Sequence, residues 1–129
     1  EACDAGSAAT LSKLCLRRAG GGTNLEPGMA MELIVYPKGC MSSSCTKVHT
    51  STCAVSVAAK QVSVTGLICV EGTGGIGPCT ADCNGGGFAT CDLGGLAAGD
   101  YVVSLGNLTL KLTLPMTLPA GGLCTGAQW

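Results

Sequence analysis

The chain has 129 residues, which is enough for one domain, and it carries ten cysteines, 21 glycines and a formal net charge of −1. This charge leaves no basic surface for nucleic acid, and no apolar run is long enough to cross a membrane as a helix. Ten cysteines without metal-ligand spacing are typical of an oxidising compartment. We therefore expect a mature, secreted protein whose leader has been removed.

Residues 8–18 fit two different elements. Leu11, Leu14 and Cys15 have the spacing of one face of a short helix. The same stretch also alternates like a strand, with Leu14 and Leu16 on one face and Cys15 on the other. The sequence leaves both alternatives open.

The first 24 residues are predicted to be an inter-subunit element, followed by a disulfide-rich domain over residues 25–129. The three glycines at 20–22 mark a hinge between the two parts. An N-terminal segment of this kind can add a strand to the open sheet edge of a neighbouring subunit. The predicted assembly residues are Leu11, Leu14 and Leu16.

A β-rich run over residues 30–36 is closed by Pro37 and predicts the first strand of the domain. The polar stretch that follows is expected to be a bridged loop over residues 39–52. Alternating valines then predict a hairpin with a turn at Ala59 and Lys60, in which Val57 faces Val62 and Val55 faces Val64.

A glycine- and cysteine-rich loop is predicted over residues 71–99, held by bridges rather than by packing. A second hairpin follows over residues 101–114, with its two-residue turn at Gly106 and Asn107. Its register places apolar residues opposite one another: Tyr101 with Leu112, Val103 with Leu110, and Leu105 with Leu108. The tail over residues 116–129 is expected to add a short strand and a bridge through Cys124.

These patterns predict an all-β fold, an antiparallel β-sandwich stabilised by multiple disulfides. Residues 96–103 read L-x-x-G-x-Y-x-V and lead into a final strand that ends at Pro115. This segment resembles the closing hairpin of bacterial extracellular Ig-like domains. The resemblance covers residues 96–115 alone and implies an Ig-like sandwich, but it implies no functional residue.

All ten cysteines are predicted to form disulfides, although their connectivity cannot be deduced from the sequence. Cys40, Cys45 and Cys53 recur at a nearly constant shift as a second triplet, which indicates either an internal duplication or chance. A zinc site would need C-x-x-C pairs, and the sequence has none. The predicted disulfide residues are Cys3, Cys15, Cys40, Cys45, Cys53, Cys69, Cys79, Cys83, Cys91 and Cys124.

Other motifs favour no catalytic, cofactor or metal site. The glycines of residues 72–77 match G-x-G-x-x-G, but no helix can follow them because Pro78 and more glycine come next. His49 is the single histidine and has no acid near it in the sequence. Asp82, Asn84 and Asp92 could contribute to a calcium site, but they lack the EF-hand pattern. Asn107 begins a glycosylation sequon.

The sequence therefore predicts a non-enzymatic extracellular structural subunit that binds copies of itself, as a pilus-like fibre or a surface-layer component. The mean hydropathy of +0.44 and the net charge of −1 favour association. The alternative is a secreted binding module, an adhesin or an inhibitor. It would present the loops over residues 39–52 and 71–99 to a cell-surface or glycan ligand.

Overall fold

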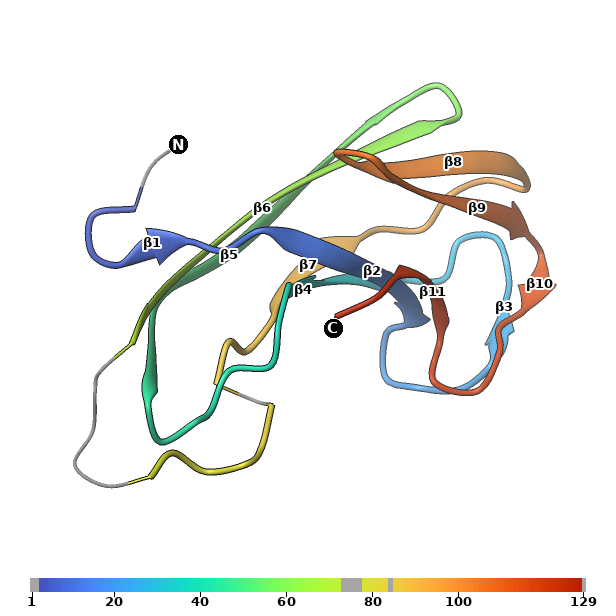
Figure 1. Cartoon of the computed structure of the whole chain (residues 1–129). Helices are drawn as coiled ribbons and strands as arrows, with labels where there is room; N and C mark the ends of the chain where they lie inside the picture. The colour runs from blue at the N-terminus through green and yellow to red at the C-terminus, as the bar shows by residue number, and fades with distance from the viewer. Residues whose placement is uncertain (1–2, 73–77, 84, 129) are drawn as a thin grey trace.

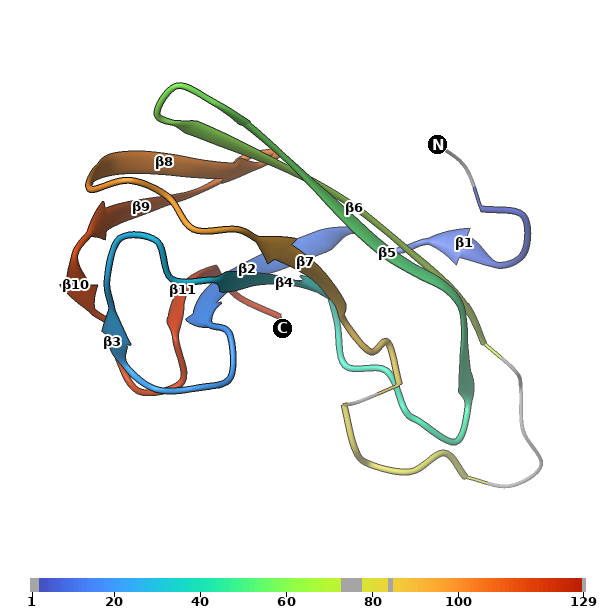
Figure 2. The same cartoon turned by 180° about the vertical axis from the view of Figure 1, so that it is seen from behind.

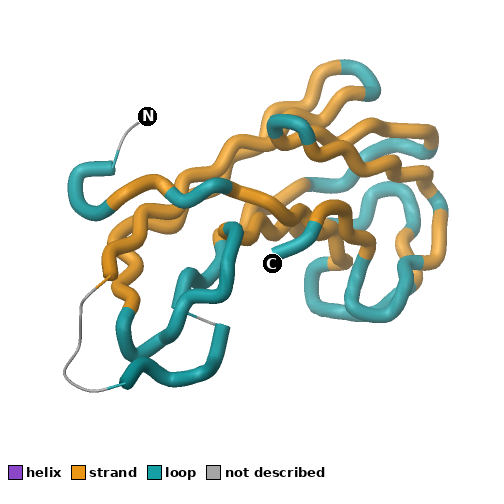
Figure 3. The backbone as a smooth tube through the Cα atoms, in the orientation of Figure 1, coloured by secondary structure: helices purple, strands orange, loops and turns teal. Residues whose placement is uncertain are grey.

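The computed structural model describes residues 3–72, 78–83 and 85–128. Over these ranges the chain forms strands and loops and no helix, as Figure 3 shows. It follows that this part of the chain holds no helix suited to crossing a membrane. The strands in chain order are β1 (Ser7–Ala8), β2 (Leu11–Arg18), β3 (Asn24–Leu25), β4 (Met31–Pro37), β5 (Thr46–Ala58), β6 (Gln61–Gly72), β7 (Ala89–Leu93), β8 (Gly99–Leu105), β9 (Leu108–Leu114), β10 (Met116–Thr117) and β11 (Leu123–Gly126).

Most of these strands belong to two sheets, which lie one over the other in Figure 1. Sheet A has β6 near its centre, with β5 along one edge and β1, β8 and β9 on the other side. Sheet B has the order β11-β2-β4-β7, and β3 pairs separately with β10. The inner faces share one core, to which both sheets contribute buried side chains: Leu14, Leu16, Leu33 and Val35 from sheet B, and Val62, Val64, Val103, Leu110 and Leu112 from sheet A.

Both predicted hairpins are confirmed with their registers. In the first, Val57 pairs with Val62 and Val55 pairs with Val64. In the second, the three predicted pairs from Tyr101 to Leu108 are all present. Each register brings apolar side chains together on the core face, and a slip of one residue would turn them all to the opposite face.

Sheet A departs from the purely antiparallel prediction because β6 and β8 run parallel over Gln61 to Ser63. Parallel neighbours need a long crossover between them. Here the crossover is the chain between β6 and β8, which leaves sheet A, contributes β7 to sheet B and then returns.

Residues 11–18 form the strand β2, so the helical alternative is wrong. This strand lies inside sheet B, hydrogen-bonded to β4 on one side and to β11 on the other. Leu14 and Leu16 have no exposed surface, and Leu11 is half-buried against the core. Leu14 and Leu16 therefore have no surface to offer a neighbouring subunit, and we retain neither of these two as an assembly residue.

Two segments predicted as loops contain strands. In residues 71–99 the strand β7 is paired with β4 and buries Ala89, Cys91 and Leu93, so packing as well as bridges holds this region. In residues 39–52 the strand β5 already begins at Thr46. Apart from Val48, its first half is polar on both faces and largely exposed, so the sequence there lacks the alternation that marks a half-buried strand.

The ten cysteines form five disulfides, as predicted. The two cysteine triplets seen in the sequence, at 40/45/53 and 79/83/91, are bridged to each other. They are therefore not two copies of one internally bridged loop. The predicted bridge through Cys124 joins it to its cross-strand neighbour Cys15. The pairs are Cys3–Cys69, Cys15–Cys124, Cys40–Cys83, Cys45–Cys79 and Cys53–Cys91.

Candidate functional site

The titratable side chains of the described residues form no cluster of three or more metal-ligating groups. The imidazole of His49 pairs with Glu71, with 2.7 Å between Nε2 and Oε1. In the loop considered for calcium, the carboxylate of Asp82 accepts hydrogen bonds from the Thr80 hydroxyl and the Ser43 amide. Asn84 and the G-x-G-x-x-G glycines after Gly72 lie outside the described residues.

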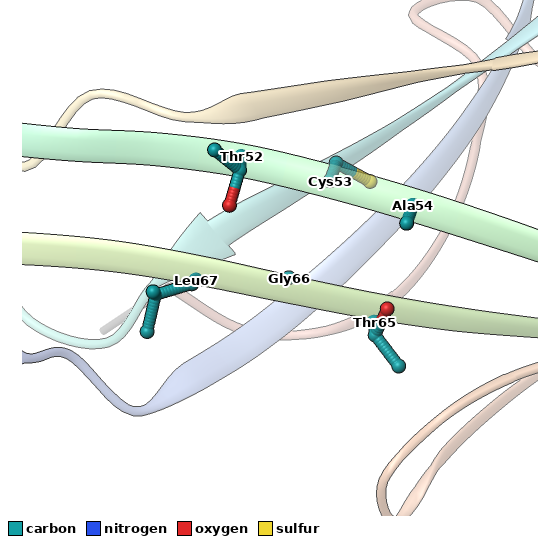
Figure 4. Close-up of a pocket in the computed structure, with 6 residues that line it drawn as sticks. All are labelled: Thr52, Cys53, Ala54, Thr65, Gly66 and Leu67. Carbon is teal, nitrogen blue, oxygen red and sulfur yellow. The ribbon is translucent and has the colours of Figure 1, made fainter. Parts of the chain in front are cut away.

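A surface hollow of about 360 Å³ lies along the β5–β6 hairpin in Figure 4. None of its lining residues is ionisable as it stands, because the one cysteine among them is bridged. The lining therefore supplies no general base that could activate the hydroxyls of Thr52 and Thr65 as nucleophiles. Its lining is Thr52, Cys53, Ala54, Thr65, Gly66 and Leu67.

Few large apolar side chains are exposed on the described surface. Val48, Val57 and Phe88 are 37%, 45% and 54% exposed. The positive mean hydropathy therefore does not produce a broad apolar surface, which was one reason to expect self-association. Two of the three exposed side chains nevertheless lie on a single strand, β5.

The strand β5 is an edge of sheet A. Among the described residues it pairs only with β6, so its outer edge has no strand partner (Figure 2). The middle of this edge is tied to sheet B, because Cys53 is bridged to Cys91 and the Ser51 hydroxyl donates a 2.6 Å hydrogen bond to the Phe88 carbonyl. The tie divides the edge into two halves.

The two halves of β5 differ in how they discourage edge-to-edge pairing. The first half has a bulge between Val48 and Thr50 and carries Lys47 and the His49–Glu71 pair. Bulges and charges, lysine above all, are the usual devices that protect an exposed edge. The second half, residues 54–58, reads AVSVA and has no charge, no proline and no bulge. It is the unprotected part of the edge.

The hydrogen-bonding groups of this half can be assigned from the turn. In a hairpin with a two-residue turn, the flanking residues Ala58 and Gln61 exchange both of their backbone hydrogen bonds, and the pairs then alternate along the ladder. Ser56 therefore bonds inward to β6, whereas Val55 and Val57 direct their N–H and C=O groups outward. These outward groups have no strand partner in the described part of the chain.

Comparison with known proteins found no matching family model, no similar curated protein and no similar solved structure.

Proposed function

We propose that the chain is a non-enzymatic extracellular structural subunit that self-associates by pairing residues 54–58 of β5 with the same residues of a second copy. Five disulfides indicate an oxidising, extracellular or secreted environment. The observation that carries the proposal is the unprotected edge, whose sequence AVSVA reads the same in both directions.

This symmetry matters because a two-fold interface places the same surface on both partners. In an antiparallel pair centred on Ser56, each Ser56 faces its own copy, Val55 faces Val57, and Ala54 faces Ala58. The outward N–H and C=O groups belong to Val55 and Val57, so this register matches donors with acceptors across the axis. A register shifted by one residue would match them with the inward groups of Ser56.

The same register covers the exposed valine of the edge. Val55 and Val57 lie on the face of sheet A that carries Val62 and Val64, both of which are buried. Pairing would bring Val55 of the second copy beside Val57, which is 45% exposed in the single chain. The ladder would stop at Cys53, where the bridge to β7 ties the edge.

The predicted contact is small. Stable interfaces use about 20–30 residues from each partner, far more than the five of this ladder. We therefore expect weak, reversible dimers that become populated where many copies are concentrated, as on a surface. A fibre or a layer would need a second contact, because one two-fold interface closes on itself.

The test replaces Ser56, which is exposed and lies on the proposed axis. In Ser56→Lys two ammonium groups would face each other, and we expect the dimer dissociation constant to rise roughly fivefold or more. Ser56→Glu should weaken dimers in the same way, and an equal mixture of the two variants should associate at least as well as the wild type. The matched control is Ser63→Lys on β6, the same change on the same face one strand further in. The measurement is sedimentation equilibrium.

Two outcomes would overturn the proposal. One is a wild-type protein that stays monomeric at concentrations of about 1 mM, where even a binding free energy of about −4 kcal/mol half-saturates a site. The other is association that persists in both Ser56 variants alone and gains nothing from mixing them.

Two finer assignments belong to the same proposal. An Ig-like arrangement is supported by the two facing sheets and by the β8–β9 hairpin, which matches the sequence pattern of the closing hairpin in such domains. A cell-surface location would provide the high local concentration that weak dimers need.

A further inference from the structure

Beyond self-association, a second feature lies at the end of the molecule away from the β5–β6 turn. The chain has only one Phe, one Trp and two Tyr, and two of these four residues meet there. The rings of Tyr36, on β4, and Phe88, just before β7, have centroids 6.0 Å apart and planes tilted by 44°. They line a surface hollow of about 210 Å³, and Phe88 is 54% exposed.

The wall of the hollow that carries Phe88 is fixed by covalent and hydrogen bonds. Cys83 lines the hollow and is bridged to Cys40 in the facing loop. The Phe88 carbonyl accepts the 2.6 Å hydrogen bond from the Ser51 hydroxyl on β5. The backbone that carries the Phe88 ring is therefore held in place before a ligand binds.

The remaining walls also depend on close backbone packing. Gln128 lines the hollow, and its carbonyl accepts a 2.6 Å hydrogen bond from the Gly39 amide. Gly86 lies so close to the facing loop that an added Cβ would come within 2.7 Å of Cγ of Pro37 and 2.9 Å of Cε of Met41. The absence of a side chain at Gly86 therefore allows the chain before β7 to pack against the loop that follows β4.

A positive charge stands beside the rings. The Lys13 ammonium lies 5.1 Å from the centroid of the Tyr36 ring. Among the described residues, the ion pairs are Arg17–Glu32 and His49–Glu71, so Lys13 has no carboxylate within ion-pair distance. The hollow thus combines aromatic faces and a glutamine, and the Lys13 ammonium lies beside the Tyr36 ring that lines it.

We propose that this hollow binds a uronic acid residue of an acidic polysaccharide. The C–H face of a pyranose ring is apolar and slightly positive, so it packs against the electron-rich faces of aromatic rings. In this site the ring would lie against Phe88 and Tyr36, its carboxylate would pair with the Lys13 ammonium, and its hydroxyls would meet the amide of Gln128. The volume is below the ~300–1,000 Å³ of pockets for drug-sized ligands, which limits the occupant to one ring.

Two other ligand classes fit the geometry less well. A quaternary ammonium group also seeks aromatic faces, but the Lys13 charge would repel it. A neutral sugar would fill the same space but would form no ion pair with the Lys13 ammonium. The charge therefore favours the acidic sugar over a neutral one of the same shape.

The test compares a galacturonic acid trisaccharide with its methyl ester, which keeps the ring but removes the charge. We expect the acid to bind more tightly than the ester in an NMR titration. Phe88→Ala should weaken binding of the acid roughly tenfold. Lys13→Gln should weaken it roughly fivefold and make the acid and the ester equal. Lys111→Gln, at an exposed lysine on β9, is the control and should change neither affinity.

The outcomes separate this proposal from the self-association proposal. Ser56→Lys should bind the trisaccharide as the wild type does, because Ser56 lies near the other end of the molecule. Equal affinity for acid and ester in the wild type would overturn the assignment of an acidic ligand. Binding that survives Phe88→Ala unchanged, or an absence of binding to both sugars, would overturn the site itself.

Discussion

Replacing Leu14 by alanine tests whether β2 is a core strand or an assembly strand. Leu14 has no exposed surface, and its backbone neighbours are Val35 on β4 and Thr125 on β11. The substitution removes a buried side chain from a strand that is paired on both sides, so the surrounding residues can relax only partly into the space.

The expected cost can be worked out from this burial. Truncation of a fully buried leucine to alanine lowers the free energy of unfolding by about 3–5 kcal/mol, which combines lost transfer free energy and the cavity. This is a large part of the roughly 5–15 kcal/mol that stabilises a typical domain. The melting temperature should fall by on the order of 10 °C. Leu11→Ala makes the same change at a half-buried position and should cost about 1–2 kcal/mol.

The assay is urea denaturation under non-reducing conditions, followed by circular dichroism, at a concentration where the protein is monomeric. Dimerisation of the folded Leu14→Ala protein should be unchanged, because the proposed contact lies on β5. A loss below about 1 kcal/mol together with abolished self-association would refute this reasoning. That result would return β2 to the role of an inter-subunit element.

Three further changes test other parts of the fold. Ala59 has a positive φ of 55° in the β5–β6 turn, so Ala59→Gly should raise the free energy of unfolding by about 0.5 kcal/mol in a denaturation titration. Gly86→Ala should lower it by about 1 kcal/mol through crowding. Gly94→Ala, with no atom near the added Cβ, should not lower it. In a non-reducing tryptic map, the short peptide that contains Cys15 should stay linked to the C-terminal peptide that contains Cys124.

The two hairpins could be predicted from the sequence because their information is local. Valine or leucine alternates on both sides of a two-residue turn, and only one register brings these side chains onto one face. The strand β7 could not be predicted in the same way. Its five residues, ATCDL, do alternate between apolar and polar, but they stand between glycine-rich stretches and no tight turn joins them to a second alternating run. The glycine and cysteine content of the region therefore favoured a loop.

Features that depend on contacts between residues far apart in the chain could not be predicted from the sequence. The cysteine triplets suggested that two segments were related, but spacing alone cannot distinguish a duplication from a crosslink. The parallel pairing of β6 with β8 depends on a crossover of many residues. The candidate assembly edge shows the same limit: the symmetry of AVSVA is visible in the sequence, whereas its position on an open sheet edge is not. Leu14 and Leu16 were apolar and near the N-terminus, and nothing local distinguishes a core strand from a donated one.

Two of the disulfides overlap along the chain in a way that protects it against proteolysis. Cys3–Cys69 encloses the first part of the chain, Cys15–Cys124 encloses the rest, and the two loops share residues 15–69. A single backbone cleavage anywhere between Cys3 and Cys124 therefore leaves two fragments that remain covalently joined. Outside the cell, where peptidases act and no repair follows, a nicked copy would keep its mass and its strands in place. It would fall apart only when a reductant opened the bridges.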